Sequence, residues 1–225
     1  MKKKVDPQCA MCGVDMRACF SKEGTGPAFC PTLHRSSEAK KALKKYQNPK
    51  TKHFAKAASR QEAECYIERN AKSGVLKPTK TRVEEIVEFA KKMGYQKIGV
   101  AFCGGLFSEA NTFVRILEKH GLEALSVCCK VGGVPKEVLG LKDDEKVRIG
   151  SYETMCNPIT QAEIFNAAKT DFNVLVGLCV GHDSLFFKHA KALSTVLVAK
   201  DRVLGHNPAA ALYGIKVYFQ RLIKP

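Results

Sequence analysis

The residues with the most chemistry in this chain are its ten cysteines. Cysteine thiolates bind soft metal ions and iron–sulfur clusters, whereas structural disulfides belong mainly to small secreted domains. The start of the chain, MKKKVDP, has no apolar segment of the signal-peptide kind, so we expect a cytoplasmic protein whose thiols stay reduced. Cys65 fits a small buried packing residue. The other nine predict metal or cluster binding rather than disulfides.

Four cysteines form a compact set near the start of the chain: Cys9, Cys12, Cys19 and Cys30. The first two are separated by two residues, which lets both sulfurs reach one ion in a tight turn. The later spacings match no single zinc-finger class, and a cysteine followed by proline, as at Cys30, is also found in bacterial ferredoxins. The set predicts a metal site, with an iron–sulfur cluster of the 4Fe–4S type favoured over zinc. His34 could replace one ligand, although a surface position is the simpler interpretation.

A second group of cysteines lies at the ends of predicted elements in the later part of the chain. Cys103 and Cys179 each end a predicted strand beside glycines, and Cys156 stands at the start of a predicted helix. Cys128 and Cys129 end another strand, where side-chain alternation lets only one face a site, and Cys129 is favoured. Because the carboxyl ends of parallel strands meet at one edge of a sheet, we expect a shared cofactor site there. The predicted set is Cys103, Cys129, Cys156 and Cys179.

Polar side chains gather at the same predicted edge. His182 opens a helix just after Cys179, and Asp201 and His206 follow the last predicted strand. An imidazole there could bind a metal, carry a proton or orient a ligand. We predict His182, His206 and Asp201 as catalytic residues. The charged run 200–202 as a whole is also consistent with ordinary solvated charge.

The elements that must position these residues alternate between strands and helices. Predicted strands cover 97–102, 122–128, 173–178 and 195–199, with a fifth near 147–151. Predicted helices cover 81–94, 108–120, 158–169, 185–190 and 209–222. Such alternation is typical of a parallel sheet covered by helices on both faces. We therefore expect residues 79–225 to form a small, doubly wound, Rossmann-like α/β domain with a mostly parallel sheet.

Residues 1–78 have a different character. The first 35 are rich in turn-forming residues, and helices are predicted over 38–46 and from Ser59, which has capping-box spacing to Glu62, to about Ala71. Gly74 and Pro78 mark the end of this region. Residues 1–78 are therefore predicted to form a cysteine-rich, helical N-terminal extension that binds a metal or cluster.

The net charge of +15 is concentrated in the first 80 residues, which carry 18 Lys and Arg against 7 Asp and Glu. Such an excess can bind nucleic acid. The lysines are, however, spread over a helical stretch with few aromatic residues, and thiolate-bound metals leave negative charge that they can offset. We therefore disfavour a nucleic-acid partner and expect a small-molecule substrate or a redox partner. No membrane partner is expected, because apolar runs such as 174–180 are too short to span a bilayer, and the oligomeric state stays open.

Several stretches resemble an uncharacterised bacterial family described as predicted metal-binding proteins, domain of unknown function 1847. The matching stretches are PQCAMC at 7–12, FCGGL at 102–106, MCNP at 155–158, GLCVGHDS at 177–184 and KDRVLGHNP at 200–208. The resemblance covers nearly the whole chain, and the last two stretches are its most specific part. It implies a bound metal and organisms of anaerobic habit, but no particular reaction.

Two other functions fit parts of the pattern. The stretch 177–181 imitates a nucleophile elbow around Cys179, and Asp201 and His206 follow in triad order, as in a hydrolase or transferase. The 5-residue separation of acid and histidine and the short domain argue against it. The other function is a zinc-stabilised module that binds nucleic acid. The sequence has no dinucleotide or P-loop signature, and it leaves enzymatic activity open.

Overall fold

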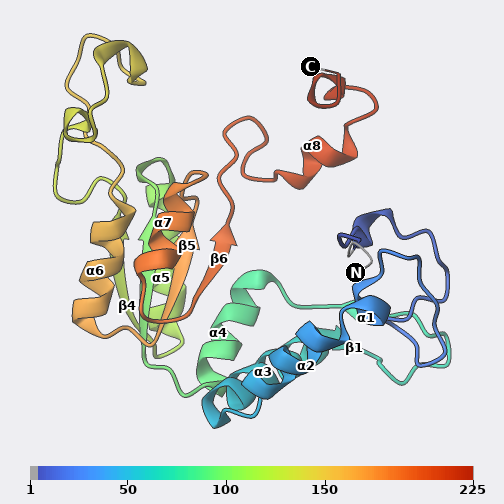
Figure 1. Cartoon of the computed structure of the whole chain (residues 1–225). Coiled ribbons are helices and arrows are strands. Elements are labelled where there is room, and N and C mark those ends of the chain that lie inside the picture. Colours follow the sequence, from blue (N-terminus) through green and yellow to red (C-terminus); the bar gives the residue numbers. More distant parts are fainter. Residues whose placement is uncertain (1–4, 225) are drawn as a thin grey trace. The chain divides into compact units, whose positions relative to one another are not determined.

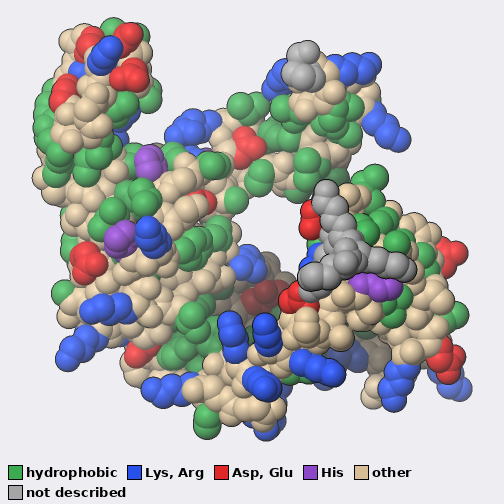
Figure 2. All heavy atoms as spheres, viewed as in Figure 1, with side chains coloured by type: hydrophobic (Ala, Val, Ile, Leu, Met, Phe, Trp, Pro, Cys, Tyr) green, Lys and Arg blue, Asp and Glu red, His purple; other side chains and the backbone are tan. Residues whose placement is uncertain are grey.

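The computed structural model describes residues 5–224 and divides into two compact units, one ending at Glu62 and one starting at Ala63. The predicted region 1–78 begins with four residues outside the described part. In the first unit, a turn-rich segment containing η1 (Cys9–Met11) leads to α1 (Pro31–His34), α2 (Ser36–Lys45) and α3 (Pro49–Glu64), whose last two residues belong to the second unit. Figure 2 shows Lys and Arg side chains over the visible surface of α2 and α3.

The helix predicted from Ser59 to Ala71 is wrong in both bounds. Helix α3 starts ten residues earlier because the Asn48 side chain accepts hydrogen bonds from the Lys50 and Thr51 amides, at 3.0 and 3.2 Å, and proline occupies the first helical position. The helix ends at Glu64, and the chain then forms a short strand. Ser59 therefore lies inside the helix rather than at its cap.

The second unit contains a two-stranded and a four-stranded sheet with flanking helices (Figure 1). The short antiparallel pair is β1 (Tyr66–Ile67) and β2 (Lys77–Pro78). The large sheet consists of β3 (Lys97–Phe102), β4 (Glu123–Cys128), β5 (Phe172–Val176) and β6 (Ser194–Val198). The α-helices are α4 (Arg82–Lys92), α5 (Phe107–Lys119), α6 (Pro158–Ala168), α7 (His182–His189) and α8 (Ala209–Tyr213). Short 3-10 turns are η2 (Gly104–Leu106), η3 (Lys136–Leu139), η4 (Asp143–Glu145) and η5 (Gln220–Leu222).

The four long strands are all parallel, in the order β4-β3-β5-β6. This confirms the predicted α/β class and the predicted parallel sheet. The chain moves from β3 outward to β4 and then returns to the other side of β3 to form β5. The connections therefore diverge between β3 and β5, which is the point where open α/β sheets form ligand crevices.

Helices cover both faces of this sheet. The Phe102 ring packs edge-on against Phe107 of α5, with ring centroids 4.8 Å apart. The neighbouring Ala101 side chain, which strand alternation places on the opposite face, belongs to a buried cluster with Phe165 of α6 and Phe186 of α7. The sheet is thus doubly wound, and β5 is buried along its whole length.

Two predicted elements of this unit are wrong. Residues 147–151 form turns instead of a strand, because the Val147 and Arg148 amides donate to the Glu153 carboxylate instead of to a neighbouring strand, at 2.9 and 3.1 Å. The closing helix predicted over 209–222 stops at Tyr213. At Gly214 the chain turns back, and its carbonyl accepts the amides of Tyr218 and Phe219.

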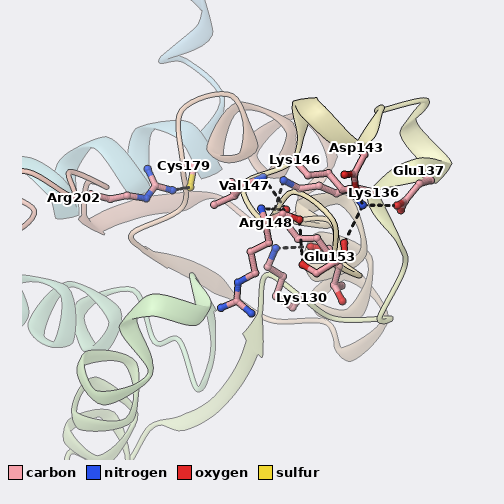
Figure 3. Close-up of polar contacts among 12 residues, drawn as sticks. Lys130, Lys136, Glu137, Asp143, Lys146, Val147, Arg148, Glu153, Cys179 and Arg202 are labelled. Carbon is pink, nitrogen blue, oxygen red and sulfur yellow. Dashed lines mark hydrogen bonds and ion pairs between the residues drawn. The ribbon is translucent and has the colours of Figure 1, made fainter.

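The long connection from β4 to α6 forms a separate lobe, which we call the crevice loop (residues 130–155). Lys146 pairs with Glu137 at 2.9 Å and with Asp143 at 2.6 Å, and Lys136 pairs with Glu153 at 2.9 Å (Figure 3). These pairs give the loop a defined shape without regular strands. Within residues 5–224, no helix has both the length and the apolar character needed to cross a membrane.

Candidate metal centres

The four predicted N-terminal ligands line one cavity of about 380 Å³ in the first unit. They are Cys9, Cys12, Cys19 and Cys30. Three turns bring them there. The Cys12 amide donates to the Cys9 carbonyl at 3.1 Å, Cys19 lies two residues after Arg17, which forms a parallel bridge with Thr25, and Cys30 directly precedes α1.

Gly24 lets the two sides of this N-terminal segment meet. A Cβ atom at Gly24 would lie 2.4 Å from the carbonyl carbon and oxygen of Arg17, closer than any real contact. The absence of a side chain therefore permits the approach that forms the Arg17–Thr25 bridge. The cavity depends on backbone turns rather than on a large core, since the residues from 5 to 30 are half-buried or exposed.

The four predicted cysteines of the second unit also come together. Cys103 directly follows β3, Cys129 directly follows β4, and Cys156 lies two residues before α6. Cys179 lies three residues after β5. All four line one cavity of about 430 Å³, which we call the crevice, and His182 at the start of α7 lines it with them. Residues up to 76 positions apart thus share a site at the carboxyl edge of the sheet, as the sequence predicts.

Cys129 is the centre of this group. It is only 3% exposed, and its sulfur interacts with the sulfurs of both Cys103 and Cys156. The Gly104 amide also donates to the Cys129 sulfur, at 3.4 Å. The neighbouring Cys128 packs against the hydrophobic core and does not line the crevice. The structure thus places Cys129, and not Cys128, beside the other thiols.

The contacts among these thiols shift their acidity. The hydrogen bond from Cys129 lowers the pKa of Cys103 to about 4, helped by the Gly105 amide and the Lys200 ammonium. The same partner lowers the pKa of Cys156 to about 5, with a further effect of Lys130 and His182. The pKa of Cys129 itself is raised, because its thiol pairs with the Cys103 and Cys156 sulfurs and its side chain is buried. The group thus favours the proton on the central sulfur and the thiolate form on its two neighbours.

Cys179 and His182 have different surroundings. The Cys179 sulfur accepts a hydrogen bond from Arg202 Nη2 at 3.0 Å (Figure 3). The Nδ1 atom of His182 is buried and has no hydrogen-bond partner within residues 5–224. A buried imidazole nitrogen without a partner is uncommon, and ligand binding would satisfy it.

Asp201 and His206 lie outside the set of residues that line the crevice. The His206 ring accepts the Asp201 backbone amide at its Nδ1 atom, at 3.1 Å, and the residue adopts a φ of 65°. The Asp201 carboxylate accepts the amides of Val203 and Leu204, both at 2.9 Å. The carboxylate thus holds a turn instead of orienting the imidazole, so these contacts do not reproduce a hydrolase triad with Cys179.

Across the part of the chain that the structure describes, no group of three or more His, Cys, Asp or Glu side chains is arranged to hold a single metal ion. The comparison with known families identifies the chain more directly. The model of the family described as "Protein of unknown function (DUF1847)" matches residues 30–197. The chain belongs to the DUF1847 family.

One similar protein is the uncharacterized protein MJ0455 of Methanocaldococcus jannaschii. It is 54% identical over 145 residues, which cover 64% of this chain and 72% of the relative. No solved structure matches the chain. The DUF1847 match includes all four crevice cysteines and Cys30, whereas Cys9, Cys12 and Cys19 precede it.

Sequence reasoning missed the cations that surround the crevice. Lys200 approaches Cys103, Lys130 approaches Cys156, and Arg202 binds Cys179. A signal was present, since Lys130 directly follows a strand-end cysteine and Lys200 and Arg202 follow β6. The sequence identified this last run only as charge at the sheet edge.

Proposed function

We propose that this protein binds an iron–sulfur cluster in the crevice through Cys103, Cys129 and Cys156, for a redox or small-molecule reaction. The observation that supports this most strongly is the convergence of these thiols, from the β3–α5 and β4–α6 connections, on one cavity in which Cys129 pairs with both Cys103 and Cys156. Thiolates are the ligands that iron–sulfur clusters use. The pKa of two of the three thiols, Cys103 and Cys156, is lowered, which favours the thiolate forms that bind metal.

The crevice has suitable donors and suitable space. Thiolates form on Cys103 and Cys156 without an added base, because the pKa of each lies well below neutral pH. The Gly104 amide donates to the Cys129 sulfur, the kind of hydrogen bond that tunes cluster potentials. A volume of about 430 Å³ is more than ten times the roughly 30 Å³ that one water molecule takes in the liquid. The crevice therefore has room for a multi-atom cluster.

The N-terminal cavity is proposed as a second centre of the 4Fe–4S type. Four cysteines line it, which is the usual number of protein ligands for such a cluster, and its volume of about 380 Å³ is similar to that of the crevice. A centre with all four positions filled by protein has no place for substrate, so its role would be structural or electron-relaying. Zinc is the alternative occupant of this cavity.

When bound, the crevice cluster would supply one-electron chemistry or a Lewis-acidic iron. The protein's own residues would do the rest. Gly104 and Gly105 would direct backbone amides at the sulfurs, and Lys130 and Lys200 would offset their negative charge. The buried Nδ1 atom of His182 would hold a proton or accept one beside the site.

The test is to purify the full chain without oxygen and to measure iron, acid-labile sulfide and zinc beside a visible absorption spectrum. Two clusters of the 4Fe–4S type predict about eight irons per chain, and the triple variant Cys103→Ser, Cys129→Ser, Cys156→Ser should keep about four. A matched control is Cys65→Ala, since Cys65 is buried elsewhere and bonds to Glu85 at 3.2 Å.

A colourless protein with stoichiometric zinc and no sulfide would contradict the iron–sulfur proposal. Iron that the triple variant retains in full would contradict the crevice as its site. Both outcomes are read from metal content alone, so neither depends on knowing the reaction.

A further inference from the structure

Cys179 stands apart from Cys129 and the two thiols that pair with it, Cys103 and Cys156. It lines the same crevice, but its sulfur accepts a hydrogen bond from Arg202 at 3.0 Å. A guanidinium carries five N–H donors, and this bond uses one of them. Arg202 is exposed and has no carboxylate partner in the described part of the chain. It can therefore bind a further anion beside Cys179.

The charge around the crevice leaves room for that anion. Arg202, Lys130 and Lys200 contribute three positive charges, whereas the charge of Glu153 is balanced by Lys136 at 2.9 Å. Three cysteine thiolates on a cluster core of about two plus would give a net charge of about minus one. The crevice with its cluster would thus keep a surplus of about two positive charges.

Part of the crevice lining, which we call the apolar wall, is hydrophobic. It is formed by Leu139, Leu141, Val147 and Met155 of the crevice loop. Two of these side chains are well exposed, Leu139 at 62% and Val147 at 84%. Exposed apolar side chains around a few convergent polar groups are typical of a small-molecule site, in which the ligand covers the apolar surface.

We propose that the crevice binds a small carboxylate with an apolar chain, whose carboxylate pairs with Arg202 beside Cys179 and whose chain lies against the crevice loop. This inference names the substrate class of the proposed cluster site, so it rests on the proposed function. It requires that Cys179 faces the substrate and is not a cluster ligand. Arginine suits a carboxylate because its planar fork makes two parallel hydrogen bonds.

Binding is tested by calorimetry on the full chain with acetate, butanoate and hexanoate at constant ionic strength. Affinity should rise along the series, by up to about fourfold for each methylene that the apolar wall covers. Hexanol, which lacks the charge, should bind at least tenfold more weakly than hexanoate. Arg202→Gln should lose at least tenfold in hexanoate affinity, whereas Arg221→Gln, in the C-terminal η5 turn, should not change it.

The apolar wall has its own test. Val147→Ser should flatten the dependence on chain length while leaving acetate binding unchanged, and Val138→Ser is a matched control on the same loop but outside the crevice lining. Equal affinity of hexanoate for the wild-type chain and Arg202→Gln, or no measurable binding of hexanoate to folded wild-type protein, would overturn the proposal.

Metal analysis separates this inference from the proposed function. Cys179→Ala should keep full iron, whereas Cys129→Ala should lose the crevice iron. A wild-type chain without iron would contradict the proposed cluster. Carboxylate binding would then be measured on the metal-free protein and would be accepted or rejected there. A wild-type chain with iron that Cys179→Ala loses would instead defeat the assignment of Cys179 to the substrate side.

Discussion

The two thiol sites of this protein are built by opposite means. The N-terminal site takes its four cysteines from residues 9–30, which turns and one short bridge hold together. The crevice takes its cysteines from residues 103–179, which a parallel sheet brings to one edge. The first site is local in sequence and open to solvent. The second is non-local, and the nearly fully buried Cys129 lies at its centre.

This difference shows in the chemistry of the sulfurs. In the crevice, the positions of Cys103 and Cys156 beside Cys129 and two lysines lower the pKa of both thiols. The sheet that gathers these residues thus also favours their thiolate forms. At the N-terminal site the cysteines only share a cavity, so any metal there would contribute more to holding the segment together.

The largest expected effect on the difference between the two sites comes from removing the central sulfur of the crevice. Cys129→Ala should abolish crevice iron and halve the total, because two neighbouring thiolates lose their shared partner and one ligand disappears. Cys128→Ala is the matched control, since that side chain packs in the core next door. Iron analysis of anaerobically purified proteins decides the matter, and equal iron loss in both variants would contradict the geometry.

A glycine tests the N-terminal site without touching a sulfur. Gly24→Ala should lower N-terminal iron several-fold, because the new Cβ would lie 2.4 Å from the Arg17 carbonyl group and separate the two sides of the segment. The measurement is iron content in a Cys129→Ala background, which leaves only the N-terminal centre. Gly13→Ala, whose new Cβ has no atom within 4 Å, is the control and should retain full iron.

The acidity of Cys103 offers a smaller, pH-dependent effect. Because its pKa is lowered to about 4, its thiolate persists above that pH, and alkylation of the metal-free protein should change little between about pH 6 and 8. For an ordinary thiol with a pKa of about 8.5, the alkylation rate falls nearly tenfold for each unit by which the pH is lowered over that range. Peptide mass spectrometry after iodoacetamide treatment measures the rate at each site.

The cause of that acidity can be separated into parts. Cys129→Ala removes the main cause and should make Cys103 alkylation follow the ordinary pH dependence. Lys200→Gln removes a lesser one and should shift the curve less. If the alkylation rate of wild-type Cys103 already falls tenfold for each pH unit below pH 8, the thiol contacts do not exist in solution.

The smallest expected effect concerns the crevice loop. Hydrogen bonds and the ion pair with Lys136 lower the pKa of Glu153 to about 2 from its ordinary 4.5. A lowered carboxyl pKa stabilises the fold above the ordinary value, and this contribution is lost as pH falls from about 4.5 towards 2. Glu153→Gln should raise proteolytic cleavage of the loop a few-fold at pH 7, with a smaller effect at pH 3, where part of the contribution has been lost. Glu163→Gln on α6 is the control, and equal cleavage of both variants would argue against the network.

Much of this fold follows from local sequence signals. The strands near 97–102 and 173–178 and the helix after Asn157 were predictable, because buried runs and caps are encoded within a few residues. The start of α3 was missed although Asn48 and Pro49 form a clear cap, since a weaker capping signal at Ser59 was favoured. The break at Gly214 depends on the approach of Phe219, which propensity does not show.

The grouping of the cysteines in the candidate site was also predictable from the sequence. The rule that parallel strands end at one edge was enough to group four cysteines, and alternation was enough to favour Cys129 over Cys128. The partners of those thiols were not predictable. The contacts of Lys130, Lys200 and Arg202 depend on where the crevice loop and the segment after β6 run, which long-range packing decides.

The strand order has a consequence for how the protein matures. Because β3 lies between β4 and β5, Cys103 and Cys129 cannot be fixed beside Cys156 until the chain has been made through β5 and the centre of the sheet has closed. Parallel pairings of this kind form late and slowly. The N-terminal thiols are complete once residue 30 has been made. If the proposed clusters form, the first could thus be loaded on a nascent chain, whereas the crevice cluster would have to be loaded after the domain has folded.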